Sequence, residues 1–213
     1  MIDDAAAIAW LQDALNVPRE TIAQLDVLRS LVIAENAHQN LISASSIASF
    51  WTRHIVDSAQ LLPLAASARA GAWLDLGTGA GFPGLVVALL SDRPMILVES
   101  RRKRFEFLLA VTQHLKLDHV SVHGGTLQSL ATRIVSVISA RAFAPLPKLL
   151  TLAHRFSRNE TIWLLPKGKS VGDEMELISG TWQSRFHVEP SITDPFSEII
   201  VGTSVNPVRT SHK

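Results

Sequence analysis

A short apolar segment that leads directly into alternating glycines limits the folds open to this chain. Residues 72–76 are predicted to form a buried strand, and a helix is predicted to begin at Pro83. Between them, glycine occupies every second position, at Gly77, Gly79 and Gly81. Backbone N–H groups and the positive end of the helix border such a turn, which favours a ligand of the nucleotide type. The alternative is a glycine-rich turn that binds nothing, although three glycines weaken a fold.

The chain divides near residue 70 into two patterns. Before that point, apolar residues recur at helical spacing, so we expect a helical N-terminal extension over residues 1–70. After it, apolar runs alternate with helical stretches, which predicts an α/β fold with a mostly parallel sheet over residues 71–205. The expected strands are residues 72–76, 95–99, 119–123, 134–139, 161–166, 185–189 and 198–202. Residues 206–213 are polar and are predicted to form a flexible tail.

Composition narrows the class of protein. The absence of cysteine excludes disulfides and thiolate metal ligands, and the histidines show no spacing typical of a metal site. No apolar run approaches the roughly 20 residues of a membrane span, and the acidic start is unlike a secretory signal, so we expect a cytoplasmic protein. The net charge is −3 over residues 1–70 and +4 over residues 71–213. This asymmetry weakly favours an anionic partner, with solvated surface charge as the alternative.

The spacing of the glycines indicates which nucleotide is bound. A dinucleotide-binding turn would have its third glycine at position 82, where Phe82 stands. The pattern Asp-x-Gly-x-Gly-x-Gly, from Asp75 to Gly81, is instead typical of S-adenosylmethionine-dependent methyltransferases. We therefore expect their Rossmann-like fold, with a mostly parallel seven-stranded sheet, and S-adenosyl-L-methionine as cofactor at Gly77, Gly79 and Gly81.

Two carboxylates accompany this turn. Glu99 ends the second expected strand, 18 residues beyond Gly81, where a carboxylate can accept both ribose hydroxyls of the adenosyl group. Asp75 either meets the methionine end of the cofactor or orders the glycine turn.

Six segments, in order along residues 36–170, resemble the RsmG family, also called GidB. They are Asn40-Leu41-Ile42-Ser43, Arg53-His54-Ile55-Val56-Asp57-Ser58, residues 75–84, 101–108 and 139–144, and Lys167-Gly168. The resemblance implies transfer of methyl from S-adenosylmethionine to N7 of a guanine in small-subunit (16S) ribosomal RNA. It also implies that Gly77, Phe82, Leu127, Gln128 and Arg141 contact the cofactor.

The chain departs from the family pattern at three positions. Gln128 stands where the family usually has an acid, and Ser136 stands where it often has an Asp. Ala140 is an extra residue between Ser139 and Arg141. Because a Gln amide can still hydrogen-bond the adenine edge, we expect altered cofactor affinity rather than lost binding.

Methylation at N7 demands positioning rather than a base. N7 already carries an in-plane lone pair, so holding it about 3 Å from the methyl group should dominate catalysis, and no residue is certain to be catalytic. An Arg bound to both O6 and N7 would block that lone pair. Arg141 is therefore expected to hold the cofactor carboxylate, or else to be a surface ion-pair residue. The positioning candidates are Arg141, Lys167, His54 and Arg53.

Basic residues at the start of a helix suggest where RNA binds. Four bases oppose the macrodipole there, which indicates another demand on them, such as phosphate contact. The RNA-binding candidates are Arg53, Arg101, Arg102, Lys103, Arg104 and Lys167, and Lys148, Arg155, Arg158 and Lys169 could extend that surface. Arg53 is alternatively expected to pair with Asp57 on one helix face.

These features favour a ribosomal RNA guanine-N7 methyltransferase that acts on naked small-subunit RNA or on the small ribosomal subunit. We expect a monomer without a metal ion and without a membrane partner. Two other functions stay open: a small-molecule methyltransferase with a closed apolar pocket, and a non-catalytic RNA-associated protein that only binds the cofactor.

Overall fold

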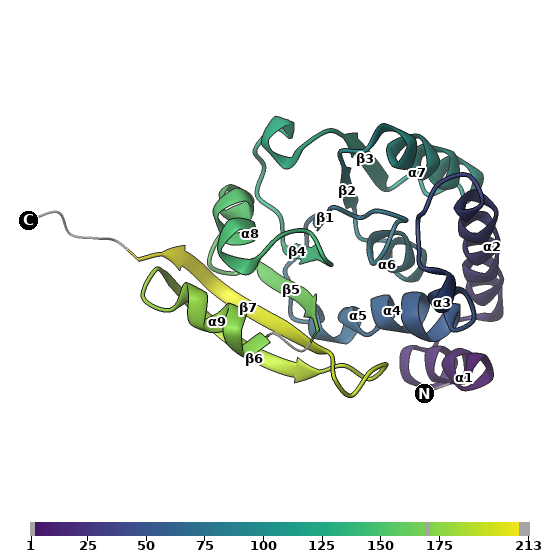
Figure 1. Cartoon of the computed structure of the whole chain (residues 1–213), viewed down its shortest axis with the longest axis horizontal. Helices are drawn as coiled ribbons and strands as arrows, with labels where there is room; N and C mark the ends of the chain where they lie inside the picture. The colour runs from purple at the N-terminus through teal and green to yellow at the C-terminus, as the bar shows by residue number, and fades with distance from the viewer. Residues whose placement is uncertain (1–2, 169–170, 209–213) are drawn as a thin grey trace, which may run out of the picture.

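The computed structural model describes residues 3–168 and 171–208 and has a seven-stranded sheet at its centre (Figure 1). The strands are β1 (Trp73–Leu76), β2 (Met95–Glu99), β3 (Val120–Gly124), β4 (Val137–Ala140), β5 (Ile162–Lys167), β6 (Trp182–Pro190) and β7 (Glu198–Pro207). Their order is β3-β2-β1-β4-β5-β7-β6. The first five are parallel, whereas β7 runs antiparallel to both of its neighbours. The predicted mostly parallel seven-stranded α/β fold is confirmed.

Helices cover both faces of the sheet. Before β1 lie α1 (Asp4–Leu15), α2 (Arg19–Asn36), α3 (Ala44–Ile47), the π-helix η1 (Trp51–Val56), α4 (Asp57–Ala59) and α5 (Leu61–Leu64). Between and after the strands lie α6 (Gly84–Leu90), α7 (Arg102–His114), the 3-10 helix η2 (Leu127–Ser129), α8 (Leu146–Ala153), the 3-10 helix η3 (His154–Phe156) and α9 (Val171–Ile178). The helical N-terminal region is therefore present as predicted, and Pro83 immediately precedes α6.

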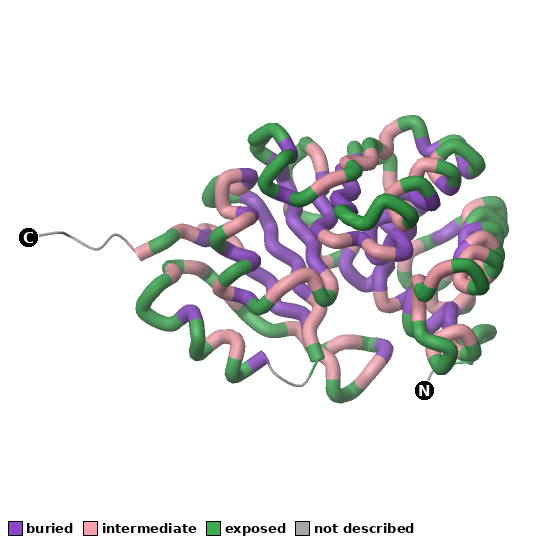
Figure 2. Tube along the Cα trace, turned by 45° about the horizontal axis from the view of Figure 1, so that its top comes forward, coloured by how far each residue is buried: buried purple, intermediate pink, exposed green. Residues whose placement is uncertain are grey.

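The alternation of side chains along the strands divides the core into two layers. Trp73 and Leu97 face the N-terminal helices, α6 and α7, whereas Leu74 and Trp163 face α8 and α9. The central strands β1, β2 and β4 and most of β5 are buried between these layers, whereas the outer strands β3 and β6 are partly exposed (Figure 2). Leu28 of α2 belongs to the same cluster as Trp73, so the change of pattern near residue 70 does not separate two cores.

Three expected boundaries are wrong. The sixth strand begins at Trp182 rather than at residue 185, because Trp182 and Gln183 pair with the end of β7. The fourth strand begins at Val137 rather than at residue 134, because Ile134 is 43% exposed at the sheet edge. The last strand continues to Pro207, where Asn206 and Pro207 pair with Gln183 and Trp182, so these two residues do not belong to a tail. Residues 209–213 of the predicted tail lie outside the described residues.

Candidate functional site

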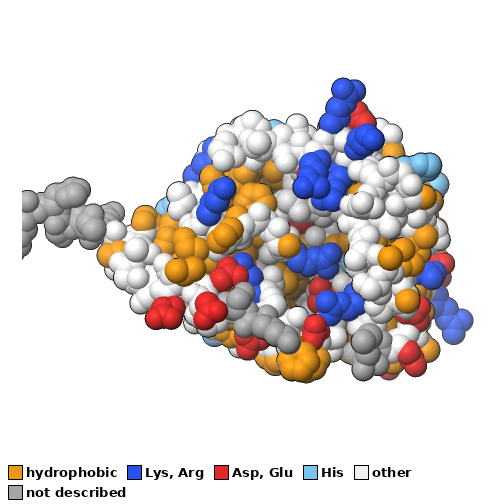
Figure 3. Space-filling view, viewed as in Figure 1, with side chains coloured by type: hydrophobic (Ala, Val, Ile, Leu, Met, Phe, Trp, Pro, Cys, Tyr) orange, Lys and Arg blue, Asp and Glu red, His pale blue; other side chains and the backbone are white. Residues whose placement is uncertain are grey.

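A pocket of about 980 Å³ opens at the carboxyl ends of β4 and β5. Its walls come from residues 41–60 of the N-terminal region, from residues 141–145 after β4, and from residues 166–168 and 191–199. In Figure 3, Lys and Arg side chains surround a hollow on this face of the molecule. Ligands bind at this edge in parallel α/β sheets, and the volume is within the range of small-molecule sites.

The glycine turn after β1 lies beside this pocket. Gly77 has φ +63°, and a Cβ there would come within 2.7 Å of the Phe143 ring, which itself lines the pocket. Gly79 has φ +60° and is half-buried, so its backbone remains accessible to a ligand. Gly81 differs, because it is buried and a Cβ there would collide with Leu85. Of the three predicted cofactor glycines, Gly81 thus serves the packing of α6 against the turn.

The two predicted carboxylates have different surroundings. Glu99 is 5% exposed and accepts hydrogen bonds from the amides of Gly79 (3.1 Å) and Arg101 (2.7 Å), which fix its carboxylate at the end of β2. Each of its oxygens bonds one amide and has a second lone pair for a ligand hydroxyl. The backbone therefore orients Glu99 toward the side of the turn on which Gly79 lies.

Asp75 lies beneath the turn. It is fully buried, and its oxygens accept hydrogen bonds from the Ser139 hydroxyl (2.6 Å) and the Gly84 amide (3.1 Å). Burial raises the pKa of Asp75, although these hydrogen bonds oppose the shift. The carboxyl group ties β4 to the start of α6, so of its two expected roles the geometry favours ordering of the turn over direct cofactor contact.

The Leu127–Gln128 pair lies in η2, with Leu127 buried and Gln128 exposed. Arg155 holds this segment, because its guanidinium donates to the carbonyls of Leu127 (2.6 Å), Gln128 (3.3 Å) and Leu130 (2.9 Å). It also lies 4.4 Å from the Phe156 ring centroid. Arg155 therefore orders the segment that contains Leu127 and Gln128, whereas the sequence suggests that it extends a surface for RNA.

Two departures from the family pattern lie away from the pocket. Ser136 receives a hydrogen bond from Arg93 (3.0 Å) at the amino end of β4, the opposite edge of the sheet. Ala140 continues β4 and pairs in register with Leu76, so the extra residue lengthens the strand without a bulge.

The Arg53–Asp57 ion pair expected on one helix face is wrong. Residues 51–56 form a π-helix, whose wider turn removes the regular i to i+4 spacing. Arg53 instead pairs with Asp194 (2.9 Å) in the loop between β6 and β7, and Asp57 pairs with Arg141 (3.3 Å). Nothing in the local sequence around Arg53 signals a partner 141 residues away.

His54 and Phe82 join this π-helix to the glycine turn. Their rings stack with centroids 4.8 Å apart, and Phe82 also meets the edge of Phe50. Arg141 lies 5.7 Å from the centroid of the Phe82 ring and donates to Nδ1 of His54 at 3.4 Å. This bond assigns the imidazole proton to Nε2, which lies 3.0 Å from the Ser46 hydroxyl.

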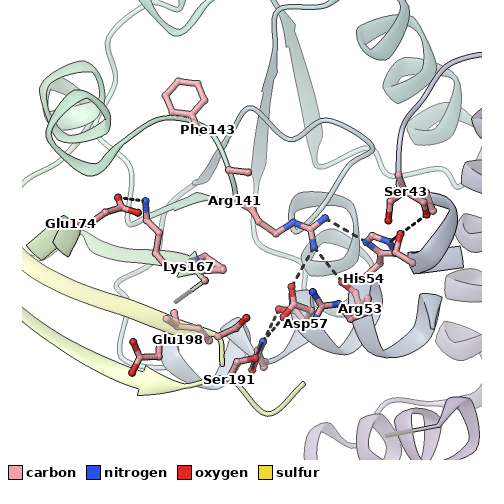
Figure 4. Close-up of a pocket in the computed structure, with 18 of the residues that line it drawn as sticks. Ser43, Arg53, His54, Asp57, Arg141, Phe143, Lys167, Glu174, Ser191 and Glu198 are labelled. Atoms are coloured by element: carbon pink, nitrogen blue, oxygen red, sulfur yellow. Dashed lines mark hydrogen bonds and ion pairs between the residues drawn. The ribbon is translucent and has the colours of Figure 1, made fainter. Parts of the chain in front are cut away.

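The surroundings of His54 keep its ring neutral. Burial, followed by the nearby charges of Arg141 and Arg53, lowers the pKa of His54 to about 3. His54 therefore carries no proton to donate as an imidazolium near neutral pH. Arg141 is held by its bond to His54, by the Asp57 carboxylate and by the Arg53 carbonyl (3.3 Å), and it points into the pocket (Figure 4).

Lys167 is part of the pocket wall. Its Nζ lies 2.7 Å from Oε2 of Glu174, and the two side chains are 12% and 17% exposed. This pairing differs from the predicted role of Lys167 as an RNA phosphate contact, because a phosphate would have to compete with Glu174 for the ammonium group. Neither Glu174 nor Phe143 is a site candidate from the sequence, because Glu174 lies outside the family segments and the segment 139–144 points to Arg141 rather than to Phe143.

The basic residues around α7 separate into two kinds. Arg101, Arg102 and Lys103 are exposed, and Arg102 pairs with Glu106 (2.7 Å). Arg104 donates to the Asn40 carbonyl (3.0 Å), which ties α7 to the loop after α2.

The other basic candidates are scattered. Lys148 is exposed on α8, whereas Arg158 precedes β5 and thus lies at the sheet edge opposite the pocket. Lys169 lies outside the described residues. Within residues 3–168 and 171–208, we find no cluster of three or more acidic or histidine side chains suited to a metal ion, and no helix with the length and apolar character of a membrane span.

Comparison with known proteins identifies relatives over nearly the whole chain. The family described as rRNA small subunit methyltransferase G (GidB) matches residues 21–194. Two curated proteins named ribosomal RNA small subunit methyltransferase G are 54% identical, in Sphingopyxis alaskensis, and 52% identical, in Rhizorhabdus wittichii. The alignments cover 94% of this chain in both cases and 86% and 93% of the two relatives.

Solved structures share the fold at low sequence identity. An O-methyltransferase from Bacillus cereus in complex with SAH superposes with a TM-score of 0.60 at 16% identity, covering 92% of this chain and 96% of that chain. A mutant of MtNAS in complex with S-adenosylmethionine gives a TM-score of 0.59 at 19% identity, covering 95% of this chain and 84% of that chain.

Proposed function

This chain belongs to the rRNA small subunit methyltransferase G (GidB) family, and on that premise we propose how its residues carry out the reaction. It is an S-adenosylmethionine-dependent ribosomal RNA methyltransferase, and its target is N7 of a guanine in small-subunit RNA. The observation that carries the residue assignment is the meeting, at one sheet edge, of the glycine turn, Glu99 and an open pocket lined by charged side chains.

The residues around the glycine turn fit an adenosyl cofactor. Glu99, oriented by two amides, would accept the ribose hydroxyls, and the exposed Gln128 would meet the adenine edge. Gly77 and Gly79 would let the ligand approach the backbone. Arg141, which is anchored by Asp57 and His54, would hold the cofactor carboxylate.

The chemistry follows from the nucleophile. When bound, S-adenosylmethionine supplies a methyl group on a positively charged sulfur. Guanine N7 attacks with its lone pair, the new N–C bond forms as the C–S bond breaks, and the electron pair remains on sulfur. No proton leaves N7, so a general base is not required. The neutral His54 agrees with this, because its nitrogens are occupied by Arg141 and Ser46.

The RNA would approach over the basic start of α7. Arg101 and Lys103 are exposed and would contact phosphates, as would Arg102 once it leaves Glu106. Because the substrate is ribosomal RNA, we propose that the protein acts in the cytoplasm, as a monomer, on either naked RNA or the small subunit.

One experiment tests this function. Methyl transfer from labelled cofactor is measured to naked 16S RNA and to small subunits from a strain that lacks the enzyme. Methylation at one guanine, absent from RNA with 7-deazaguanine at that position, is expected. Methylation of the 7-deaza substrate at the same base would contradict N7 as nucleophile. Cofactor binding with no transfer to either substrate would favour a non-catalytic protein, whereas the open, charged pocket already disfavours a small-molecule enzyme with a closed apolar site.

A further inference from the structure

An ion pair at the end of β5 is not required by the cofactor site proposed above. Lys167 ends β5, and Glu174 lies in α9 across the pocket wall. Lys167 Nζ and Glu174 Oε2 are 2.7 Å apart, and the same Oε2 accepts the Leu146 amide at 2.9 Å. Both side chains line the pocket, largely buried (Figure 4).

The pair has unused hydrogen-bonding capacity. An ammonium group has three N–H donors, and only one is directed to Glu174. Within the described residues, Glu174 Oε1 has no hydrogen-bond partner. The pocket wall therefore has a hydrogen-bond donor, Lys167 Nζ, beside an acceptor, Glu174 Oε1. The ion pair and the Leu146 amide hold both side chains in place.

This donor and acceptor complement one edge of guanine. On its Watson–Crick edge, guanine has the acceptor O6 next to the donor N1–H, followed by the N2 amino group. Adenine has the reverse order, with a donor at N6 and an acceptor at N1. A lysine directed to O6 and a carboxylate directed to N1–H and N2–H would therefore accept guanine and reject adenine.

The orientation of such a base suits methylation at N7. N7 lies on the Hoogsteen edge, which adjoins the Watson–Crick edge at O6, so a base bound at its Watson–Crick edge leaves the N7 lone pair free. In Figure 4, Arg141 and His54 lie across the pocket from Lys167 and Glu174, on the side of the glycine turn. Phe143, which packs on Gly77, borders the same space and offers a ring for stacking.

We propose that Lys167 and Glu174 select the target base by binding the Watson–Crick edge of a guanine turned out of the RNA. Lys167 donates to O6, and Glu174 Oε1 accepts from the N1 and N2 groups. The proposal rests on the function proposed above and adds the residues that choose the base. The carboxylate also faces a base that gains positive charge when N7 is methylated, so its attraction increases toward the transition state.

The test combines protein variants with inosine at the target position. Inosine keeps N7, O6 and N1–H but lacks the N2 amino group. The variant Glu174→Gln keeps an oxygen for Lys167 and Leu146 and replaces the second oxygen by an NH2 group, which cannot accept from guanine. Lys167→Met removes the donor to O6, which guanine and inosine share. A double variant of an exposed ion pair on α2, Asp26→Arg with Arg29→Asp, serves as the matched control.

The expected signature differs between the two variants. The wild type should prefer guanine over inosine by about 10-fold in kcat/KM, the scale of one hydrogen bond to a charged group. Glu174→Gln should lower activity on guanine by about 100-fold and bring the guanine-to-inosine ratio close to one. Lys167→Met should lower activity on both bases and keep the ratio. The α2 control should match the wild type, and the cofactor Kd and the Tm, measured for every variant, establish that the fold is intact.

Two results would overturn the assignment. If the Glu174→Gln enzyme is folded and keeps the wild-type guanine-to-inosine ratio of kcat/KM, the Lys167–Glu174 pair only links β5 to α9 and does not select the base. A wild type that methylates guanine and inosine equally well would remove N2 from the recognition, while leaving the proposed function standing. Failure of the wild type to methylate guanine at all would instead overturn the proposed function and this inference together.

Discussion

Replacement of Glu99 tests the cofactor site most directly, because the structure fixes what each variant loses. Glu99→Gln keeps one acceptor oxygen and loses the other, whereas Glu99→Ala loses both. A hydrogen bond to a charged group contributes about 1.5–3 kcal/mol, and roughly 1.4 kcal/mol changes a Kd tenfold. The Kd for S-adenosylmethionine should therefore rise about 10-fold or more in Glu99→Gln and about 100-fold or more in Glu99→Ala.

The same variants also affect stability by a separable amount. Glu99 accepts hydrogen bonds from the amides of Gly79 and Arg101. Because Arg101 is exposed, water can replace Glu99 as the partner of its amide in the variants. The half-buried Gly79 amide is left with the desolvation cost, about 1–3 kcal/mol in the free energy of unfolding. Urea unfolding measures this loss in the free energy of unfolding. The cofactor Kd is then measured only for samples that remain folded.

Calorimetric titration with S-adenosylmethionine is the assay, and Glu106→Gln is its control. Glu106 is an exposed carboxylate on the neighbouring α7, paired with Arg102 at the surface, so its loss should leave the Kd within about twofold. If folded Glu99→Gln and Glu99→Ala also bind within twofold of the wild type, Glu99 does not hold the ribose and the placement of the cofactor along β2 is wrong.

Four further predictions concern the surroundings of the site. The pKa of His54 falls from 6.5 to about 3 on folding, so between these pH values the unfolded chain binds a proton that the folded chain does not bind. The free energy of unfolding should therefore decrease as the pH falls from 6.5 toward 3, by up to about 1.4 kcal/mol per pH unit from this residue. Urea unfolding at several pH values measures this slope, and His54→Gln should lack it. Over the pH range in which the protein stays folded, log kcat should remain flat through pH 8, and a titration near pH 6.5 would contradict a neutral His54. Arg155→Ala should free the carbonyls of Leu127 and its neighbours and raise the cofactor Kd while leaving the salt dependence of RNA binding unchanged; the opposite pattern would return Arg155 to the RNA surface. Arg101→Ala with Lys103→Ala should lower the slope of log Kd against log salt by about one unit per phosphate contact and keep the cofactor Kd, and an unchanged slope would mean that both charges are merely solvated.

The parts of the fold that depend on local pattern could be predicted from the sequence. Apolar runs placed β1 and β2 within one residue of their observed bounds, since strands buried on both faces leave continuous hydrophobic stretches. The glycine turn was also predictable, because positive φ at Gly77 and Gly79 excludes most other residues. Each of these features depends on residues that are neighbours in the sequence.

Features that depend on distant partners could not be predicted. The spacing of Arg53 and Asp57 fits an ordinary helix, and only the contacts to Asp194 and Arg141 show that a π-helix directs them apart. Likewise a basic residue has the same sequence signal whether it faces solvent or carbonyls, so the sequence could not show that Arg155 bonds the carbonyls of Leu127 and Leu130.

Asp57 explains why so many polar contacts meet between the N-terminal region and the end of the sheet. Its Oδ1 accepts from Thr193 (2.8 Å) and Gln60 (3.0 Å), and its Oδ2 accepts from Arg141 (3.3 Å). The side chain of Gln60, which follows α4, in turn accepts a hydrogen bond from the Ile192 amide at 2.9 Å. The loop between β6 and β7 is therefore anchored to the end of α4, and Asp57 joins this loop to Arg141. A reaction that needs no base gains its rate from placing two reactants, and placement to within an ångström requires walls that do not move relative to each other. One carboxylate that joins the pocket's outer loop to the arginine beside the glycine turn meets that requirement.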